Sequence, residues 1–223
     1  MKPYQHPITF KSSGNLALDY QFAFADYETN LTPYLPADRA AKILDIGCGW
    51  GQFLSWLKQK NFHNLEGIDV GADQIEHCRS IGLNASCATD SLLFLREKSE
   101  TYDFITLHHV IEHMPPTIGI ELLKAICHSL RPGGTAIIQT PNMSSISAGF
   151  SRFIEVTHVT GYTDSSLHEA LLLGGLPTWW FLVLEHHSNS LPNGSHGWAC
   201  NPVFACCGEQ RYFQNLDPML HVS

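Results

Sequence analysis

Short apolar runs alternate with longer amphipathic stretches from Lys42 to Thr140. The runs have the length of buried strands, and the stretches repeat their apolar residues with the period of a helix. Such alternation predicts parallel strands in one sheet, because each helix returns the chain to the edge where the previous strand began. The expected strands are residues 43–46, 65–68, 85–88, 104–107 and 135–139, and the expected helices are residues 51–60, 72–81, 91–97 and 118–130. The chain therefore predicts an α/β fold with a mostly parallel sheet and helices on both faces.

The segments on either side of this alternation have a different composition. Residues 1–41 carry many aromatic side chains without a clear period, which predicts a flanking lid segment that is partly helical. Residues 141–160 hold Pro141, Asn142 and several serines, which indicates a long loop over the site. A helix is expected at residues 164–173.

The C-terminal part of the chain lacks a convincing edge for the sheet. Residues 179–184 are apolar and predict a sixth strand, whereas residues 186–223 do not alternate as its partner strand should. We therefore expect an irregular tail and an incomplete sheet edge, covered by the tail or by a second subunit in a homodimer. We therefore expect the chain to consist of a flanking segment (residues 1–41), one domain (residues 42–185) and the tail (residues 186–223).

The net charge argues against a polyanionic partner. The chain has 13 Lys and Arg against 21 Asp and Glu, a formal net charge of −8 at pH 7. It contains no basic run that could follow a phosphate backbone, which excludes nucleic acid as the expected partner. No apolar run approaches the roughly 18 residues of a membrane span, and the first residues do not resemble a signal peptide. We therefore expect a cytoplasmic protein.

The 7 cysteines form no recognisable pairing. Most stand singly in the expected elements, which predicts reduced thiols. Cys200, Cys206 and Cys207 lie near His196, but their spacing matches no common zinc motif, and we assign no metal to them.

A glycine-rich loop lies between the first expected strand and the first expected helix, from Asp45 to Gly51. Glycines in this place let the backbone approach a ligand closely. Asp69 ends the second strand, where a carboxylate can accept both hydrogen bonds of a vicinal diol. Asp90 follows the third strand. Each acid alone is more often a helix cap, but acids at successive strand ends favour a nucleoside ligand.

The loop fits a cationic ligand better than a pyrophosphate. A nicotinamide-binding loop has the spacing Gly-x-Gly-x-x-Gly or Ala, whereas Gly51 comes one place too early and Gln52 occupies the third small position. Asp45 would repel a pyrophosphate and would attract the ammonium and sulfonium groups of S-adenosylmethionine. The electrostatics therefore favour this methyl donor.

Four motifs, ILDIGCGWGQFL, GIDV, YDFITLHHVIEHMP and LRPGGTAIIQTPN, resemble those of class I S-adenosylmethionine-dependent methyltransferases over about residues 36–142. The resemblance implies a Rossmann-like sheet and S-adenosylmethionine as cofactor. It implies contacts from Asp45, Gly47, Cys48, Gly49 and Gly51 to the methionine portion, from Asp69 to the ribose, from Asp90 and Ser91 to the adenine, and from the backbone of Leu107 and His108 to the amino-acid moiety. Val70, next to Asp69, is also expected to bind the cofactor. The chain departs from the family at the tail. Class I domains usually finish with an antiparallel strand pair, and the tail shows no clear pattern for the second strand of that pair.

Two further segments indicate the class of acceptor. The sequence HVIEHMP after the fourth strand most resembles the ubiquinone-type and sugar-modifying branches. The stretch EVTHVTGYTDSSLHEALLLGGL is similar to a segment of methyltransferases from surface-polysaccharide clusters. Both resemblances imply a small-molecule acceptor, and we expect O-methylation of a sugar, a glycan precursor or a similar hydroxyl compound.

Histidines gather just after the fourth expected strand, where the transferred methyl group should lie. His109 and His113 are four residues apart and share one face of a helical turn beside Glu112. Three interpretations remain open: packing and capping, a general base at His109 or His113, and a divalent metal held by both histidines and Glu112.

We take His109, His113 and His158 as the candidate catalytic residues and assign no metal. By the resemblance to the polysaccharide branch, His158 would cover the acceptor pocket, and an exposed loop position is the alternative. The aromatic residues expected to wall that pocket are Tyr20, Phe22, Tyr27 and Tyr162.

The favoured function is therefore an S-adenosylmethionine-dependent methyltransferase. The first alternative is a methyltransferase-like module that holds the cofactor or a partner without turnover. The second is an NAD-dependent oxidoreductase, which the loop spacing disfavours.

Overall fold

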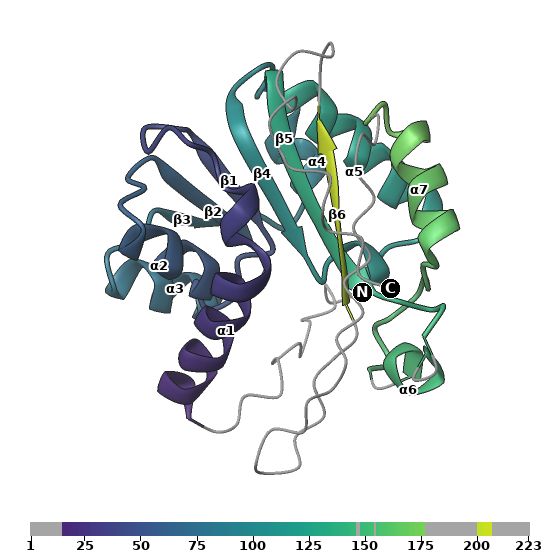
Figure 1. Ribbon diagram of the computed structural model, residues 1–223, viewed down its shortest axis with the longest axis horizontal. Coiled ribbons are helices and arrows are strands. Elements are labelled where there is room, and N and C mark those ends of the chain that lie inside the picture. Colours follow the sequence, from purple (N-terminus) through teal and green to yellow (C-terminus); the bar gives the residue numbers. More distant parts are fainter. Residues whose placement is uncertain (1–14, 146–147, 154, 177–199, 207–223) are drawn as a thin grey trace.

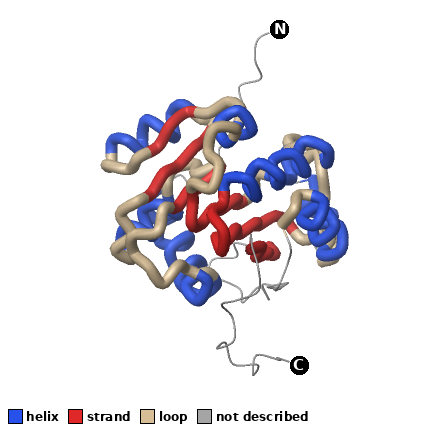
Figure 2. Tube along the Cα trace, turned by 90° about the horizontal axis from the view of Figure 1, so that it is seen from above, coloured by secondary structure: helices blue, strands red, loops and turns tan. Residues whose placement is uncertain are grey.

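The computed structural model describes residues 15–145, 148–153, 155–176 and 200–206. Within them the chain forms one 6-stranded sheet between two layers of helices (Figure 1, Figure 2). The strands are β1 (Ile43–Ile46), β2 (Leu65–Asp69), β3 (Ala85–Cys87), β4 (Tyr102–His108), β5 (Leu130–Pro141) and β6 (Cys200–Cys206). The helices are α1 (Leu16–Asn30), α2 (Gln52–Gln59), α3 (Ala72–Ser80), α4 (Ser91–Leu95), α5 (Pro116–Ser129), α6 (Ala148–Phe153) and α7 (Asp164–Leu173), with 3₁₀ turns η1 (Thr32–Tyr34) and η2 (Ile111–His113).

The sheet has the order β3-β2-β1-β4-β5-β6. All pairings from β3 to β5 are parallel, which confirms the sequence prediction. The chain first adds strands on one side of β1 and then crosses to the other side at β4. Ligands of such sheets bind at this reversal, beyond the carboxyl ends of the strands. The register sets Ile46 beside both Ile68 and Leu107, so β1, β2 and β4 end at one edge.

The sheet is buried on both faces, which explains its nearly continuous apolar strands. On one face, Leu95 of α4, Leu123 of α5 and Leu171 of α7 form an apolar cluster with Ile105 and Leu107 of β4. All five side chains are fully buried. Helices far apart in the sequence therefore share one half of the core.

On the other face, α1 and α2 pack together over β1. Phe53 and Trp56 of α2 join an apolar cluster with Ile43. Glu28 of α1 lies 2.5 Å from the Lys60 ammonium and accepts a hydrogen bond from the Trp56 indole at 3.2 Å. The prediction that residues 1–41 are partly helical is confirmed, and α1 is fixed to the domain.

The tail contains a strand, so the prediction of an irregular segment over residues 186–223 is wrong at β6. This strand pairs antiparallel with β5, from Thr135 beside Cys206 to Pro141 beside Cys200. Pro202 argued against a strand in the sequence, because proline lacks the backbone N–H that an inner strand needs. At the edge of a sheet, where β6 lies, proline is tolerated. The expected strand at residues 179–184 lies outside the described residues.

Two further helices follow β5 in the chain. The helix expected at residues 164–173 is confirmed by α7. The stretch of residues 141–160 is not a loop throughout, because it contains α6. In the part of the chain that the structure describes, no helix is long and apolar enough to cross a membrane.

Replacement of Gly67 tests how closely α2 and the loop after β1 pack on β2. A Cβ at Gly67 would lie 2.6 Å from Leu54 Cδ1 and 2.9 Å from Cys48 Sγ. Overpacking of this kind costs about 1–3 kcal/mol, so Gly67→Ala should lower the free energy of unfolding by that amount in urea denaturation. Gly149→Ala is the control, since a Cβ there meets nothing within 4 Å. Equal stability of the two variants would contradict this packing.

Candidate active site

The loop after β1 packs between Val110, which follows β4, and Leu83, which follows α3. Gly47, Gly49 and Gly51 have φ angles of 77°, 50° and 82°, a region that glycine adopts without a steric cost. A Cβ at Gly47 would lie 2.3 Å from Val110, and one at Gly51 would lie 2.5 Å from Leu83. At Gly49 a Cβ would meet nothing within 4 Å. The backbone is therefore open at Gly49 and enclosed on either side of it.

Asp69 connects this loop to the end of β2. One carboxylate oxygen accepts the N–H of Gly49 at 2.9 Å, and the other accepts the N–H of Gly71 at 2.8 Å. Each oxygen has a second lone pair. The carboxylate therefore fixes the loop and keeps the capacity to accept hydrogen bonds from hydroxyl groups.

Asp45 is a buried acid at the end of β1, with 2% of its surface exposed. Its carboxyl group accepts a hydrogen bond from the Thr106 hydroxyl at 2.8 Å. Burial raises the pKa of Asp45 to about 7, with a further rise from the charge of Asp69, and the Thr106 hydrogen bond opposes the shift. A cation at this edge of the sheet would favour the ionised form.

The other residues expected at the donor surround the same strand ends. Cys48 is buried against Gly67, so only its backbone can face a ligand. Val70 is half exposed after β2. Asp90 caps α4 and accepts the N–H of Leu93 at 3.0 Å, with Ser91 next in the chain.

His108 is an aromatic wall at the end of β4. Its ring stacks on Tyr27 at a centroid distance of 6.0 Å and meets the Phe53 ring edge-on at 4.9 Å. Burial lowers the pKa of His108 to about 3, and the charge of His109 adds to the shift. The ring is therefore neutral near pH 7, and its buried Nε2 has no hydrogen-bond partner among the described residues.

The aromatic residues expected at the pocket have different positions. Tyr20 donates a hydrogen bond to the Trp50 carbonyl, so α1 contacts the glycine loop through Tyr20 and the end of β4 through the stacking of Tyr27 on His108. Phe22 is half exposed. Tyr162 belongs to the apolar core, with its hydroxyl packed toward Gly119 of α5.

His109 and Glu112 form a hydrogen-bonded pair beyond β4. His109 Nδ1 lies 3.3 Å from Glu112 Oε1, and the Thr140 hydroxyl donates to Glu112 Oε2 at 3.1 Å. Burial alone would raise the pKa of Glu112, but the hydrogen bond and charge of His109 lower it below its ordinary value. His109 also has a φ of 53°. Such a conformation is costly for a residue other than glycine and tends to occur at functional sites.

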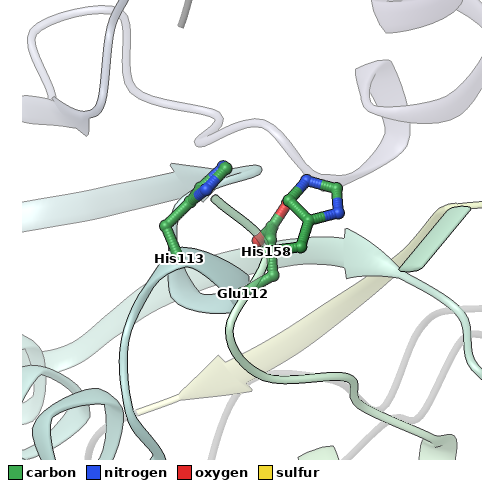
Figure 3. Close-up of side chains that lie close together, drawn as sticks. All are labelled: Glu112, His113 and His158. Carbon is green, nitrogen blue, oxygen red and sulfur yellow. The ribbon is translucent and has the colours of Figure 1, made fainter. Parts of the chain in front are cut away.

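His113 and His158 lie beside the same carboxylate (Figure 3). Their ring centroids are 4.9 Å apart, and a ligand atom from each lies within 4.8 Å of one from Glu112. His158 is only 8% exposed, which rules out the exposed loop position. The backbone carbonyl of Glu112 accepts the N–H groups of Val159 and Thr160 at 2.8 and 3.0 Å. The fold thus gathers all three candidate catalytic histidines around Glu112.

The sequence placed Glu112 beside His109 and His113, because all three follow one apolar strand, but it did not reveal that His158 joins them from a separate segment. The hydrogen bond from Thr140 to Glu112 could not be predicted from the sequence, since a threonine at the end of a strand is common.

The parallel α/β sheet, with a glycine loop after β1 and acids at the ends of β1 and β2, has the architecture of a class I methyltransferase. The sequence matches the model of a methyltransferase domain family over residues 20–200. The chain belongs to this family, whose class I members use S-adenosylmethionine as the methyl donor.

Relatives with known names share the central part of the chain. The ubiquinone biosynthesis O-methyltransferase of Xylella fastidiosa (strain 9a5c) is 30% identical over 107 residues, which are 46% of this chain and 42% of that protein. The enzyme of the same name from Aeromonas salmonicida (strain A449) is 32% identical over 106 residues, 45% and 43% of the two chains. The chain thus spans less than half the length of these relatives.

Solved structures agree on the fold. A crystal structure of an S-adenosylmethionine-dependent methyltransferase from Archaeoglobus fulgidus superimposes with a TM-score of 0.67 at 20% identity, covering 84% of this chain and 94% of that one. At this identity the match supports the Rossmann-like architecture and leaves the acceptor open.

Replacement of Asp45 tests the cost of its burial. The folded-state pKa of about 7 exceeds the ordinary 3.8. The protonated form therefore stabilises the fold fully below about pH 4, and this contribution is lost as the pH rises through about 7. Asp45→Asn buries no charge, so without donor it should raise the free energy of unfolding by about 2–4 kcal/mol near pH 8 and little near pH 4.

Urea denaturation at both pH values measures this difference. Asp73→Asn, at an exposed position in the first turn of α3, is the matched control. A gain for Asp45→Asn that is the same at both pH values would show that the charge is not its cause.

Proposed function

We propose that this domain transfers the methyl group of S-adenosylmethionine to a hydroxyl oxygen of a small molecule, with a sugar or glycan precursor as the favoured class. The observation that carries the proposal is the pairing of His109 with the buried Glu112, next to the donor side of the sheet. The names of the relatives, both O-methyltransferases, support an oxygen acceptor. The likeness of residues 155–176 to the polysaccharide branch supports the sugar.

The donor is proposed to lie across the ends of β1, β2 and β4. Asp69 accepts the ribose hydroxyls beside Gly49, and Asp45 attracts the ammonium and sulfonium groups. Asp90 and Ser91 lie on the adenine side. The backbone of Leu107 and His108 meets the amino-acid moiety. This placement uses the open backbone of the loop and offers the buried Asp45 charge a counter-charge.

Methyl transfer is a direct displacement in which the acceptor oxygen bonds to the methyl carbon as the carbon–sulfur bond breaks. Alignment of acceptor and donor supplies much of the rate. The hydroxyl proton must leave, and His109 is the proposed base, since its side chain is 34% exposed and its Nδ1 faces the carboxylate. Glu112 orients the ring and stabilises the imidazolium. His113 and His158 complete the acceptor side.

Asp69→Ala is expected to weaken the binding of S-adenosylhomocysteine by about 1–3 kcal/mol, because two ribose hydroxyls lose their acceptor. Isothermal titration calorimetry measures the change. Asp73→Ala removes a nearby exposed acid and should bind as the unaltered protein does. No binding by the unaltered protein would refute the donor site itself, whereas equal affinity in Asp69→Ala would remove Asp69 from the ribose.

His109→Ala is expected to lower the turnover of a hydroxyl acceptor by about 10²-fold and to leave donor affinity nearly unchanged. Acceptors can be found by transfer of a labelled methyl group to pools of sugars and phenols. His63→Ala is the control, because His63 is exposed and lies just before β2, at the end of the strands away from Asp69. Full turnover in His109→Ala would reject the base, and donor binding without transfer to any pool would reject the enzyme.

A further inference from the structure

The cluster of Glu112, His113 and His158 has the composition of a metal site. We propose that these three side chains bind a divalent transition-metal ion of the Zn²⁺ class. The metal interpretation left open by the sequence used His109 with Glu112 and His113, whereas the fold brings His158 to Glu112 and His113. The inference does not depend on methyl transfer or on the acceptor, because it rests only on the three side chains that would bind the ion and on their surroundings.

The three side chains are close enough to share one ion. Each offers one ligand atom, and the three atoms lie within 4.8 Å of one another. A tetrahedral ion with bonds of about 2.0–2.2 Å separates its ligand atoms by roughly 3.3–3.6 Å. The ligand atoms would therefore have to approach one another by about 1 Å when an ion binds.

The histidines are oriented as metal ligands usually are. His113 Nδ1 lies 3.2 Å from the Thr157 carbonyl, and His158 Nδ1 lies 2.9 Å from the Ser151 carbonyl. A carbonyl oxygen only accepts, so in both rings Nδ1 carries the proton and Nε2 carries the lone pair. Metal-binding histidines commonly donate the second ring N–H to a backbone carbonyl in this way. Two histidines from separate segments share this arrangement beside one carboxylate.

The carboxylate is held in place by its own partners. His109 and the hydroxyl of Thr140 each contact one oxygen of Glu112, at 3.3 and 3.1 Å. A carboxylate has about four lone-pair sites, so it can keep both contacts and coordinate an ion. Glu112 is 1% exposed and its charge is buried. A cation would compensate that charge further.

The three ligand side chains determine which metal ions fit the site. Two imidazoles and one carboxylate suit Zn²⁺ and its neighbours, whereas Mg²⁺ and Ca²⁺ prefer oxygen ligands. Three protein ligands leave a fourth position for water or for an oxygen of another molecule. His158 joins the set from the segment after α6, so the ion would fasten this segment to the end of β4.

The test uses the full chain, first treated with a chelator and then titrated with Zn²⁺ or Mg²⁺ by calorimetry. One Zn²⁺ should bind with a micromolar or lower dissociation constant, and Mg²⁺ should not bind at the same concentrations. His113→Ala and His158→Ala should each weaken Zn²⁺ binding by about 100-fold or more, and Glu112→Gln tests the carboxylate. His63→Ala should bind Zn²⁺ as the unaltered protein does.

Two controls separate loss of this site from misfolding and from zinc binding by the C-terminal cysteines. Binding of S-adenosylhomocysteine reports whether each variant is folded, and a variant that fails it is replaced by the other histidine variant. The combined variant Cys200→Ser, Cys206→Ser and Cys207→Ser should leave Zn²⁺ binding intact. The proposal is overturned by Zn²⁺ affinity that persists in both histidine variants, by affinity lost in the serine variant, or by equal binding of Mg²⁺. Donor binding that remains in any of these cases leaves the methyltransferase assignment standing.

Discussion

The hydrogen bond between the Gly49 N–H and the Asp69 carboxylate is the contact on which the proposed donor site depends. It joins the loop after β1 to the end of β2, and the second oxygen of Asp69 holds the start of α3 through Gly71. The parallel register brings these strand ends together, and the carboxylate then fixes the backbone between them. The glycine loop therefore has its shape before any ligand arrives, which lowers the ordering cost of binding.

Two buried acids on this edge of the sheet have opposite environments. Asp45 is stabilised by one neutral hydroxyl, and burial raises its pKa. Burial would do the same at Glu112, but the neighbouring His109 outweighs it and lowers the pKa. Among the described residues, Asp45 thus has no counter-charge beside it, whereas Glu112 has one in His109. A cationic donor would supply the first acid with what the second already has.

The sequence predicted the parallel core because strands that are buried on both faces form continuous apolar runs. It missed β6 because Pro202 hid the pattern, and because pairing with β5 supplies hydrogen bonds that local propensity did not indicate. In the candidate site, Asp45, Asp69 and the glycines of the loop follow from strand ends that are visible in the sequence. His158 was suggested only by a resemblance, because its approach to His113 depends on how the chain turns after β5.

The antiparallel pairing of β6 with β5 also bears on the chain entropy that the sheet must overcome. Gly49 and Asp69 are close in sequence, whereas β6 meets β5 only after a long intervening stretch of chain. The pairing of β1 with β4 joins residues that are about equally distant in the chain, such as Ile46 and Leu107. Both pairings therefore close long loops at a similar cost in chain entropy. Contacts between distant parts of the chain slow folding, so both pairings are expected to slow the formation of this sheet.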